Sequence, residues 1–194
     1  MIPNAGEENT LWTPQLAERA AKIRLLALDV DGVLTDGGIY LDNAGGEMKR
    51  FNVQDGLGAR LLLDAGVAVG VITARKSDLV ARRARELKLA FAHQGAHEKW
   101  ACLEQEMATR GLTADQCAFM GDDLVDLGVM SRVGLAACPA NAHEETRRRS
   151  HWQASAAGGE GAVRELADHI LRAQGRWDEI VAAMVAGTYG HAAQ

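Results

Sequence analysis

One short run, LALDVDGVLTDGG at 26–38, constrains this 194-residue chain more than any other. Its apolar start is typical of a buried strand, and that strand ends in two acids, Asp29 and Asp31, with Gly32 directly after them. Charge at the end of a buried strand costs free energy unless another charge compensates it. The run therefore predicts a divalent cation at this strand end and indicates phosphoryl chemistry.

Short apolar runs alternate with helical patterns along the chain. Thr13-Pro14 is predicted to open a first helix that runs to about Ala21. Later helices are expected after a cap at Ser77 and near the C-terminus, at 163–171 and from Trp177. The predicted buried strands are 23–30, 67–72, 89–92, 117–120 and 135–138. This alternation predicts an α/β fold, a parallel sheet covered on both faces, in one domain over 1–194.

The segment 37–53 breaks the alternation. Residues 39–41 and 48–53 have strand character and flank the turn signal DNAGG at 42–46, which predicts a β-hairpin. An isolated two-stranded ribbon is only marginally stable, yet this one is rich in apolar residues. We therefore expect self-association to bury the hairpin, so that the chain forms a homo-oligomer. The tail, 175–194, is compatible either with covering a neighbouring pocket or with lying free.

Polar side chains follow four of the predicted strands. Parallel strands place their carboxyl ends at one edge of the sheet, where ligands bind in such folds. An acid pair, a hydroxyl, two cations and an acid cluster are thus expected to meet there: Asp29, Asp31, Thr73, Arg75, Lys99, Asp122, Asp123 and Asp126. This convergence is the strongest functional signal in the residues themselves.

The converging set suits phosphoryl transfer. Mg²⁺ prefers hard oxygen ligands and would relieve the repulsion between carboxylates that meet at one point. Lys99 and the Thr73 hydroxyl can neutralise and bind a phosphate. An aspartate can attack phosphorus to form an aspartyl-phosphate, and a second carboxylate can protonate the leaving oxygen and then activate water.

The same residues resemble the motifs of the haloacid dehalogenase superfamily of phosphatases: DVDGVLTDG at 29–37, Thr73, Lys99 and GDDLVD at 121–126. Longer strings are similar to its capless subfamily of 3-deoxy-D-manno-octulosonate 8-phosphate (KDO 8-phosphate) phosphatases: FNVQDGLGAR, VITARKS, HQGAHEKW and GGEGAVRE. The resemblance covers about 23–177. It implies a Rossmann-like three-layer α/β/α fold with a hairpin after the first strand and no large cap domain.

The resemblance also implies an activity, the hydrolysis of KDO 8-phosphate during synthesis of lipopolysaccharide precursors. By it, Asp29 would be the nucleophile and a Mg²⁺ ligand. Asp31 would be the general acid/base and would bind the metal through its backbone carbonyl, and Asp122 would be the third protein ligand. Thr73 and Lys99 would hold the phosphate.

Supporting roles follow from the same resemblance. Arg75 would contact the anionic substrate, while Asp123 and Asp126 would orient metal-bound waters and Lys99. The hairpins would assemble a homotetramer in which a neighbouring subunit helps to cover each pocket.

The chain departs from the subfamily pattern at three positions. It has Ala74 where a glycine is usual, and Gln54 and Glu160 where arginine is frequent. The loss of two cations near a pocket for an acidic sugar phosphate is expected to affect which substrate is preferred more than how the phosphate is hydrolysed. A phosphatase for another acidic keto-sugar phosphate, such as a sialic-acid-type 9-phosphate, is therefore a second hypothesis.

Composition narrows the partners and the compartment. A net charge of −5, a pI near 5.7 and 5% aromatic residues argue against a nucleic-acid binder. No apolar stretch is long enough to span a membrane, and the N-terminus carries Glu7 and Glu8 without an apolar signal core. Three cysteines without metal spacing fit a reducing compartment. We expect a cytoplasmic protein.

Each residue taken alone has a simpler interpretation. Asp29 and Asp31 could form a polar turn, and Asp122 and Asp123 could cap the helix that follows. His93 and His97 are better explained by loop and cap roles than by a zinc pair, and Gly158-Gly159 by a turn than by a phosphate cradle. A catalytically inactive binding module would be expected to lose the nucleophile, the lysine or a metal acid, and all are present.

Overall fold

The structure is a computed structural model in which residues 11–189 are described. A six-stranded sheet runs in the order β5-β4-β1-β6-β7-β8, and every neighbouring pair is parallel. Its strands are β1 (Leu25–Leu28), β4 (Ala68–Thr73), β5 (Phe91–Gln94), β6 (Cys117–Met120), β7 (Leu135–Cys138) and β8 (Trp152–Gln153). The predicted parallel α/β fold is confirmed.

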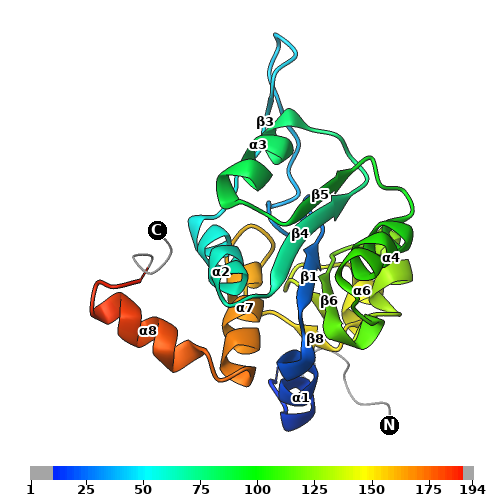
Figure 1. Cartoon of the computed structure of the whole chain (residues 1–194). Coiled ribbons are helices and arrows are strands. Elements are labelled where there is room, and N and C mark those ends of the chain that lie inside the picture. The colour runs from blue at the N-terminus through cyan, green and yellow to red at the C-terminus, as the bar shows by residue number, and fades with distance from the viewer. Residues whose placement is uncertain (1–10, 190–194) are drawn as a thin grey trace.

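Helices cover both faces of this sheet (Figure 1). They are α1 (Pro14–Lys22), α2 (Val53–Asp64), α3 (Asp78–Leu87), α4 (Lys99–Arg110), α5 (Leu127–Met130), α6 (Glu144–Arg149), α7 (Ala162–Ala173) and α8 (Trp177–Val185), with 3-10 turns at η2 (Ala114–Gln116) and η3 (Leu124–Asp126). Strand β1 shows the layering, because successive side chains alternate between faces. Leu26 and Leu28 join the core under α1, α2 and α7, whereas Leu25 and Ala27 join the core under α4 and α5.

The hairpin projects from the body at the top of Figure 1. Its strands β2 (Tyr40–Leu41) and β3 (Glu47–Met48) are antiparallel, and Asp42 closes the turn by accepting the N–H groups of Ala44 and Gly46. The predicted second strand, 48–53, is wrong in extent. The Asn52 side chain accepts the Gln54 N–H and caps α2, so the chain turns helical at Val53.

Other sequence predictions also differ from the structure. The first core strand is Leu25–Leu28 rather than 23–30. The third core strand is Phe91–Gln94 rather than 89–92, because Lys88 adopts a left-handed conformation that ends α3 and Leu89 still bonds back to Ala84. Ser77 occupies the cap position of α3, but its side chain makes no capping hydrogen bond. Strand β8, at the sheet edge, was not predicted.

A glycine loop at 158–161 packs against the turn that follows β1. The Gly159 N–H donates to the Val33 carbonyl, and a Cβ on Gly158 would lie 1.7 Å from the Gly32 carbonyl oxygen. Thr35 secures the same turn, donating its hydroxyl to the Val30 carbonyl and accepting the Gly32 N–H. Only glycine permits this close approach, which fixes the segment that carries Asp31.

Three features bear on the expected surroundings of the chain. None of the helices within residues 11–189 is long and apolar enough to cross a bilayer. Cys117 and Cys138 are buried, Cys102 is partly buried, and all are free thiols. Glu7, Glu8 and the end of the tail, 190–194, lie outside the described residues.

Candidate active site

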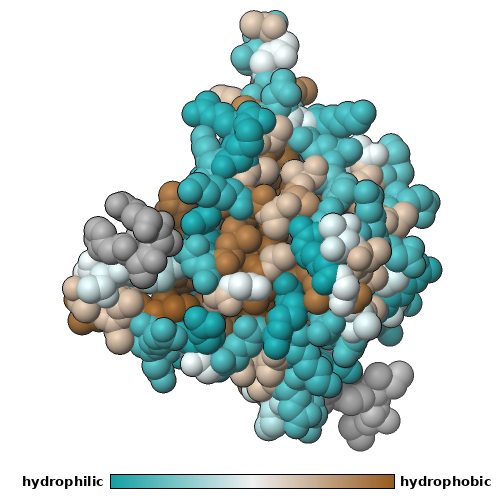
Figure 2. Space-filling view, in the orientation of Figure 1, coloured by the Kyte–Doolittle hydropathy of each residue, from teal (hydrophilic) through white to brown (hydrophobic). Residues whose placement is uncertain are grey.

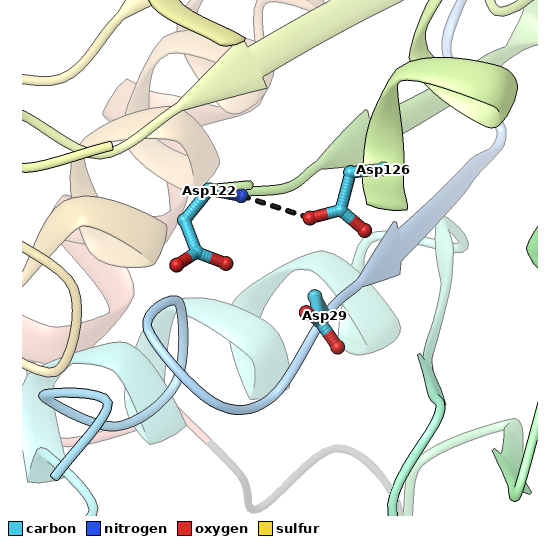
Figure 3. A group of neighbouring side chains, drawn as sticks. All are labelled: Asp29, Asp122 and Asp126. Carbon is cyan, nitrogen blue, oxygen red and sulfur yellow. Dashed lines mark hydrogen bonds between the residues drawn. The ribbon is translucent and has the colours of Figure 1, made fainter. Parts of the chain in front are cut away.

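Three acids meet where β1 and β6 end. Asp29 directly follows β1, where its N–H donates to the Met120 carbonyl, and Asp122 follows β6 by one residue. Asp126 ends η3. Each acid offers a carboxylate oxygen that lies within 4.8 Å of the others (Figure 3). We call Asp29, Asp122 and Asp126 the acid cluster.

The Asp126 carboxylate is hydrogen-bonded to the backbone of the loop that carries Asp122. It is fully buried and accepts the N–H of Asp122 at 3.0 Å and that of Asp123 at 3.3 Å. Asp123 itself is exposed and caps η3 through the Leu124 N–H. Capping therefore explains Asp123, as the simpler interpretation held, and the contact by which Asp126 completes the capping box, but it does not explain Asp122.

Lys99 is the cation of the acid cluster. It opens α4, and its side chain is only 4% exposed. Its Nζ lies 3.0 Å from Asp29 Oδ2 and 2.5 Å from Asp126 Oδ1. Burial alone would lower the pKa of Lys99, but the attraction of Asp29 and Asp126 outweighs it and raises that pKa. The ammonium therefore stays charged and links β1 to η3.

One ammonium does not neutralise three carboxylates. Burial, and then repulsion from Asp126, raises the pKa of Asp29 to about 6. Burial, followed by repulsion from Asp126 and Asp29, raises the pKa of Asp122 to about 7. A site of hard carboxylate oxygens with excess negative charge fits a Mg²⁺ ion, which would relieve both effects.

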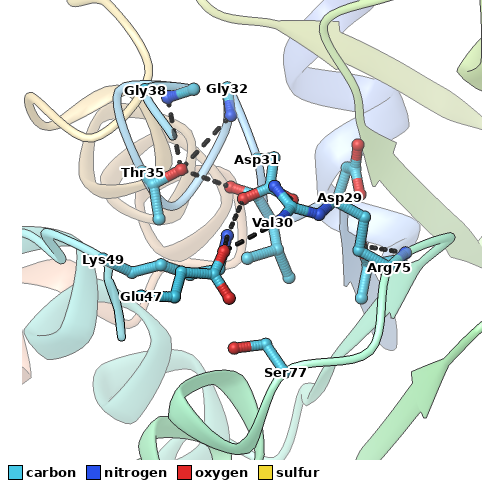
Figure 4. Close-up of polar contacts among 12 residues, drawn as sticks. Asp29, Val30, Asp31, Gly32, Thr35, Gly38, Glu47, Lys49, Arg75 and Ser77 are labelled. Carbon is cyan, nitrogen blue, oxygen red and sulfur yellow. Dashed lines mark hydrogen bonds and ion pairs between the residues drawn. The ribbon is translucent and has the colours of Figure 1, made fainter. Parts of the chain in front are cut away.

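Asp31 lies apart from the acid cluster, although it is only two residues from Asp29. Its carboxylate pairs with Lys49 Nζ from the hairpin and lies 3.7 Å from Arg75 NH1 (Figure 4). Arg75 NH2 also lies 2.9 Å from Glu47 Oε1. The structure therefore divides the five predicted acids into the acid cluster, the exposed cap Asp123, and Asp31, which faces cations at the rim of the cluster.

The second strand end contributes Thr73 and Arg75. Thr73 ends β4 and is buried, and its hydroxyl accepts the Arg75 N–H at 3.4 Å. The Arg75 side chain is 43% exposed, at the mouth of the site. The Thr73 hydroxyl is thus bonded to the backbone of the loop that carries Arg75.

Sequence reasoning missed Glu47 and Lys49, which sit at the base of the hairpin beside Asp31. The hairpin pattern signals only exposed or self-associating residues, so nothing in it marks a lysine that turns inward. It also missed Asp55, a buried acid that accepts the N–H groups of Gly161 and Arg164 and ties α2 to the glycine loop.

The chain was compared with family models, curated proteins and solved structures. No family model matches the chain. It is 43% identical over 176 residues to the 3-deoxy-D-manno-octulosonate 8-phosphate phosphatase KdsC of Yersinia pestis, covering 89% of this chain and 94% of that protein.

Solved structures agree with this. The Moraxella catarrhalis 3-deoxy-D-manno-octulosonate 8-phosphate phosphatase, in complex with magnesium, phosphate and KDO, matches with a TM-score of 0.87 at 38% identity, over 89% of this chain and 99% of that one. A Legionella pneumophila protein described as a HAD (haloacid dehalogenase) superfamily hydrolase matches with a TM-score of 0.85 at 39% identity, over 89% and 94%.

Proposed function

The chain belongs to the family of 3-deoxy-D-manno-octulosonate 8-phosphate phosphatases, within the HAD superfamily, and we propose from this that it is a Mg²⁺-dependent phosphatase of that sugar phosphate. The observation that carries the proposal is the acid cluster with Lys99 at the ends of β1 and β6. The products of the reaction are KDO and inorganic phosphate. The reaction is a step in the synthesis of lipopolysaccharide precursors.

Mg²⁺ is the cofactor that this donor set suits. Asp29 and Asp122 would hold it through carboxylate oxygens and Asp31 through its backbone carbonyl, while Asp126 stays bound to Lys99 and to the backbone of Asp122. When bound, the ion supplies positive charge that screens the nucleophile from the phosphate and stabilises charge during transfer.

The proposed reaction uses Asp29 as the nucleophile and Asp31 as the general acid/base. An Asp29 carboxylate oxygen attacks phosphorus, the bond from phosphorus to the sugar oxygen breaks, and protonated Asp31 gives its proton to that oxygen. In the second step Asp31 takes a proton from water, the water oxygen attacks phosphorus, and the bond to Asp29 breaks to release phosphate. The Asp31 carboxyl group thus gives one proton in the first step and regains one in the second.

Binding of the substrate is assigned to residues that follow the other strands of the sheet. Lys99, held between Asp29 and Asp126, and the buried Thr73 hydroxyl would bind the phosphate oxygens, and the half-exposed Arg75 guanidinium would contact the sugar acid. Asp123, which is exposed beside Asp122, would orient metal-bound water.

A substrate panel tests the proposal. With equal enzyme and saturating Mg²⁺, phosphate release should be fastest from KDO 8-phosphate and should stop in EDTA. A sialic-acid-type 9-phosphate is the comparator, because Gln54 and Glu160 replace frequent arginines; the Glu160 carboxylate pairs with Arg50. Faster release from the comparator would overturn the substrate, and no release from any phosphate would identify an inactive binding module.

The assembly and location are part of the same proposal. We infer a homotetramer built through the hairpin, supported by the exposure of Ile39, Leu41 and Met48 at 61, 72 and 64%. A single catalytic domain in the cytoplasm is supported by the one continuous main sheet and by the three free cysteines.

A further inference from the structure

A four-membered charged cluster joins the hairpin to the segment after β1. It consists of Asp31, Glu47, Lys49 and Arg75 (Figure 4), and we call it the hairpin-base cluster. Lys49 Nζ is hydrogen-bonded to Asp31 Oδ1 and lies 3.5 Å from Glu47 Oε1. Two acidic and two basic side chains thus meet within it.

Lys49 is the buried member of the hairpin-base cluster. Its side chain is only 1% exposed. The residues on either side of it are much more exposed: Met48 is 64% exposed, and the side chain of Arg50 is 54% exposed. Burial of an ammonium group carries a large desolvation cost unless the group is paired. Lys49 Nζ forms ion pairs with the carboxylates of Asp31 and Glu47, so the fold sets this lysine against Asp31 rather than in water.

The contact decides where the Asp31 carboxyl group lies. Asp29 and Asp31 are two residues apart, and yet Asp31 is absent from the acid cluster that contains Asp29. Thr35 fixes the backbone of the turn, but among the described residues only Lys49 and Arg75 form ion pairs with the carboxylate of Asp31. Of these, Arg75 is the more distant, at 3.7 Å, and the more exposed.

We propose that Lys49 is a positioning residue that holds the Asp31 carboxyl group at the rim of the site, where the leaving oxygen must receive its proton. The inference rests on the proposed function, because it assigns Asp31 the role of general acid/base. It adds a residue of the hairpin to the reaction, so the hairpin shapes the active site of its own chain as well as any contact between chains.

The test is the kinetics of Lys49→Met, with KDO 8-phosphate and p-nitrophenyl phosphate as parallel substrates. General acid/base catalysis contributes about 100-fold or more, so a misplaced Asp31 should lower kcat by about tenfold or more. KM should stay within about twofold, because Lys49 does not touch substrate. The matched control is Arg50→Met, the next residue, which pairs with Glu160 at the surface and should leave kcat unchanged.

A double-mutant cycle separates positioning from direct binding. If Lys49 acts through Asp31, Lys49→Met should cause no further loss in an Asp31→Asn background, since the group it positions is gone. An equal loss in both backgrounds, a raised KM with unchanged kcat, or a kcat within twofold of wild type would each overturn the proposal. Circular dichroism checks folding, and Lys49→Gln replaces Lys49→Met if the latter does not fold.

The outcomes distinguish this inference from the proposed function. A wild-type chain that hydrolyses p-nitrophenyl phosphate but not KDO 8-phosphate overturns the substrate alone, and the cycle is then read on the aryl phosphate. A wild type active on KDO 8-phosphate with an unaffected Lys49→Met overturns the role of Lys49 alone. A wild type inactive on both overturns the two together.

Discussion

At the scale of single residues, the acids of the site lower the stability of the metal-free fold. Asp122 is partly buried among like charges, and its pKa rises to about 7 from an ordinary 3.8. A folded-state pKa above the unfolded value means that stability is full below about pH 4 and is lost as pH rises through 7. The metal-free fold is therefore under electrostatic strain at neutral pH.

Asp122→Asn should relieve that strain. At pH 8, without metal, we expect the variant to be more stable than wild type by about 1 to 2 kcal/mol, allowing for solvent screening, with no difference near pH 3.5. Mg²⁺ should stabilise the wild type and not the variant. Urea unfolding with Mg²⁺ or EDTA measures both effects; Asp78→Asn, an exposed acid on α3, is the control. A variant less stable than wild type at pH 8 would contradict this account.

Gly32 separates backbone strain from crowding at the site. Gly32 and Gly66 have nearly the same φ, +89° and +87°, but a Cβ on Gly32 would lie 2.0 Å from Asp122 Oδ2, whereas one on Gly66 meets nothing within 4 Å. Both alanine variants should lose about 1 kcal/mol to strain. Only Gly32→Ala should also weaken Mg²⁺ binding, measured by calorimetry. Equal Mg²⁺ affinity in both variants would show that the crowding is harmless.

The acids after β1 and β6 could be predicted because a strand end leaves little freedom for the next residues. The sequence places Asp29, Thr73, Lys99 and Asp122 at one edge of the sheet, and the structure brings Asp29, Lys99 and Asp122 together there with Asp126. The direction of the Asp31 side chain could not be predicted. It depends on Lys49, whose approach is set by how the hairpin base packs and not by local sequence.

At the scale of elements, the core strands were predictable, whereas strand β8 and the exact ends of β5 and the hairpin were not. Strands β1, β6 and β7 are continuous buried apolar runs, and most of β4 is buried and apolar, which is the usual signal of a parallel sheet. Strand β8 has only two residues, and its pairing with β7 is a tertiary contact. Likewise Asn52 shortens the hairpin, because a helix cap outweighs the strand character of 51–53.

Asp55 is predicted to hold α2 and α7 together. Its carboxylate accepts the N–H of Gly161 at 3.2 Å and that of Arg164 at 2.9 Å, at the start of α7. Asp55→Ala would leave two N–H groups without this acceptor, which should cost about 2 kcal/mol or more in unfolding free energy. Urea denaturation measures it, with Asp178→Ala, an exposed first-turn acid of α8, as the control. Equal stability of the two variants would refute the link.

At the scale of the whole molecule, the hairpin stands clear of the rounded body, with apolar residues among its polar ones (Figure 2). If it forms the proposed tetramer interface, Leu41→Glu with Met48→Glu should shift the chain toward smaller species in sedimentation velocity at micromolar concentration. Val185→Glu, an 85% exposed residue on α8, is the control. A monomeric wild type would contradict the assembly.

The central claim is that Asp29 attacks the phosphate of KDO 8-phosphate, and the most direct measurement is phosphate release by Asp29→Asn with saturating Mg²⁺. Asparagine keeps the size of the side chain and replaces the nucleophilic carboxylate beside Lys99 with a neutral amide. We predict that turnover falls by about 10⁴-fold or more while the far-ultraviolet circular dichroism is unchanged. Near-normal phosphate release by a folded Asp29→Asn variant would show that another group performs the attack.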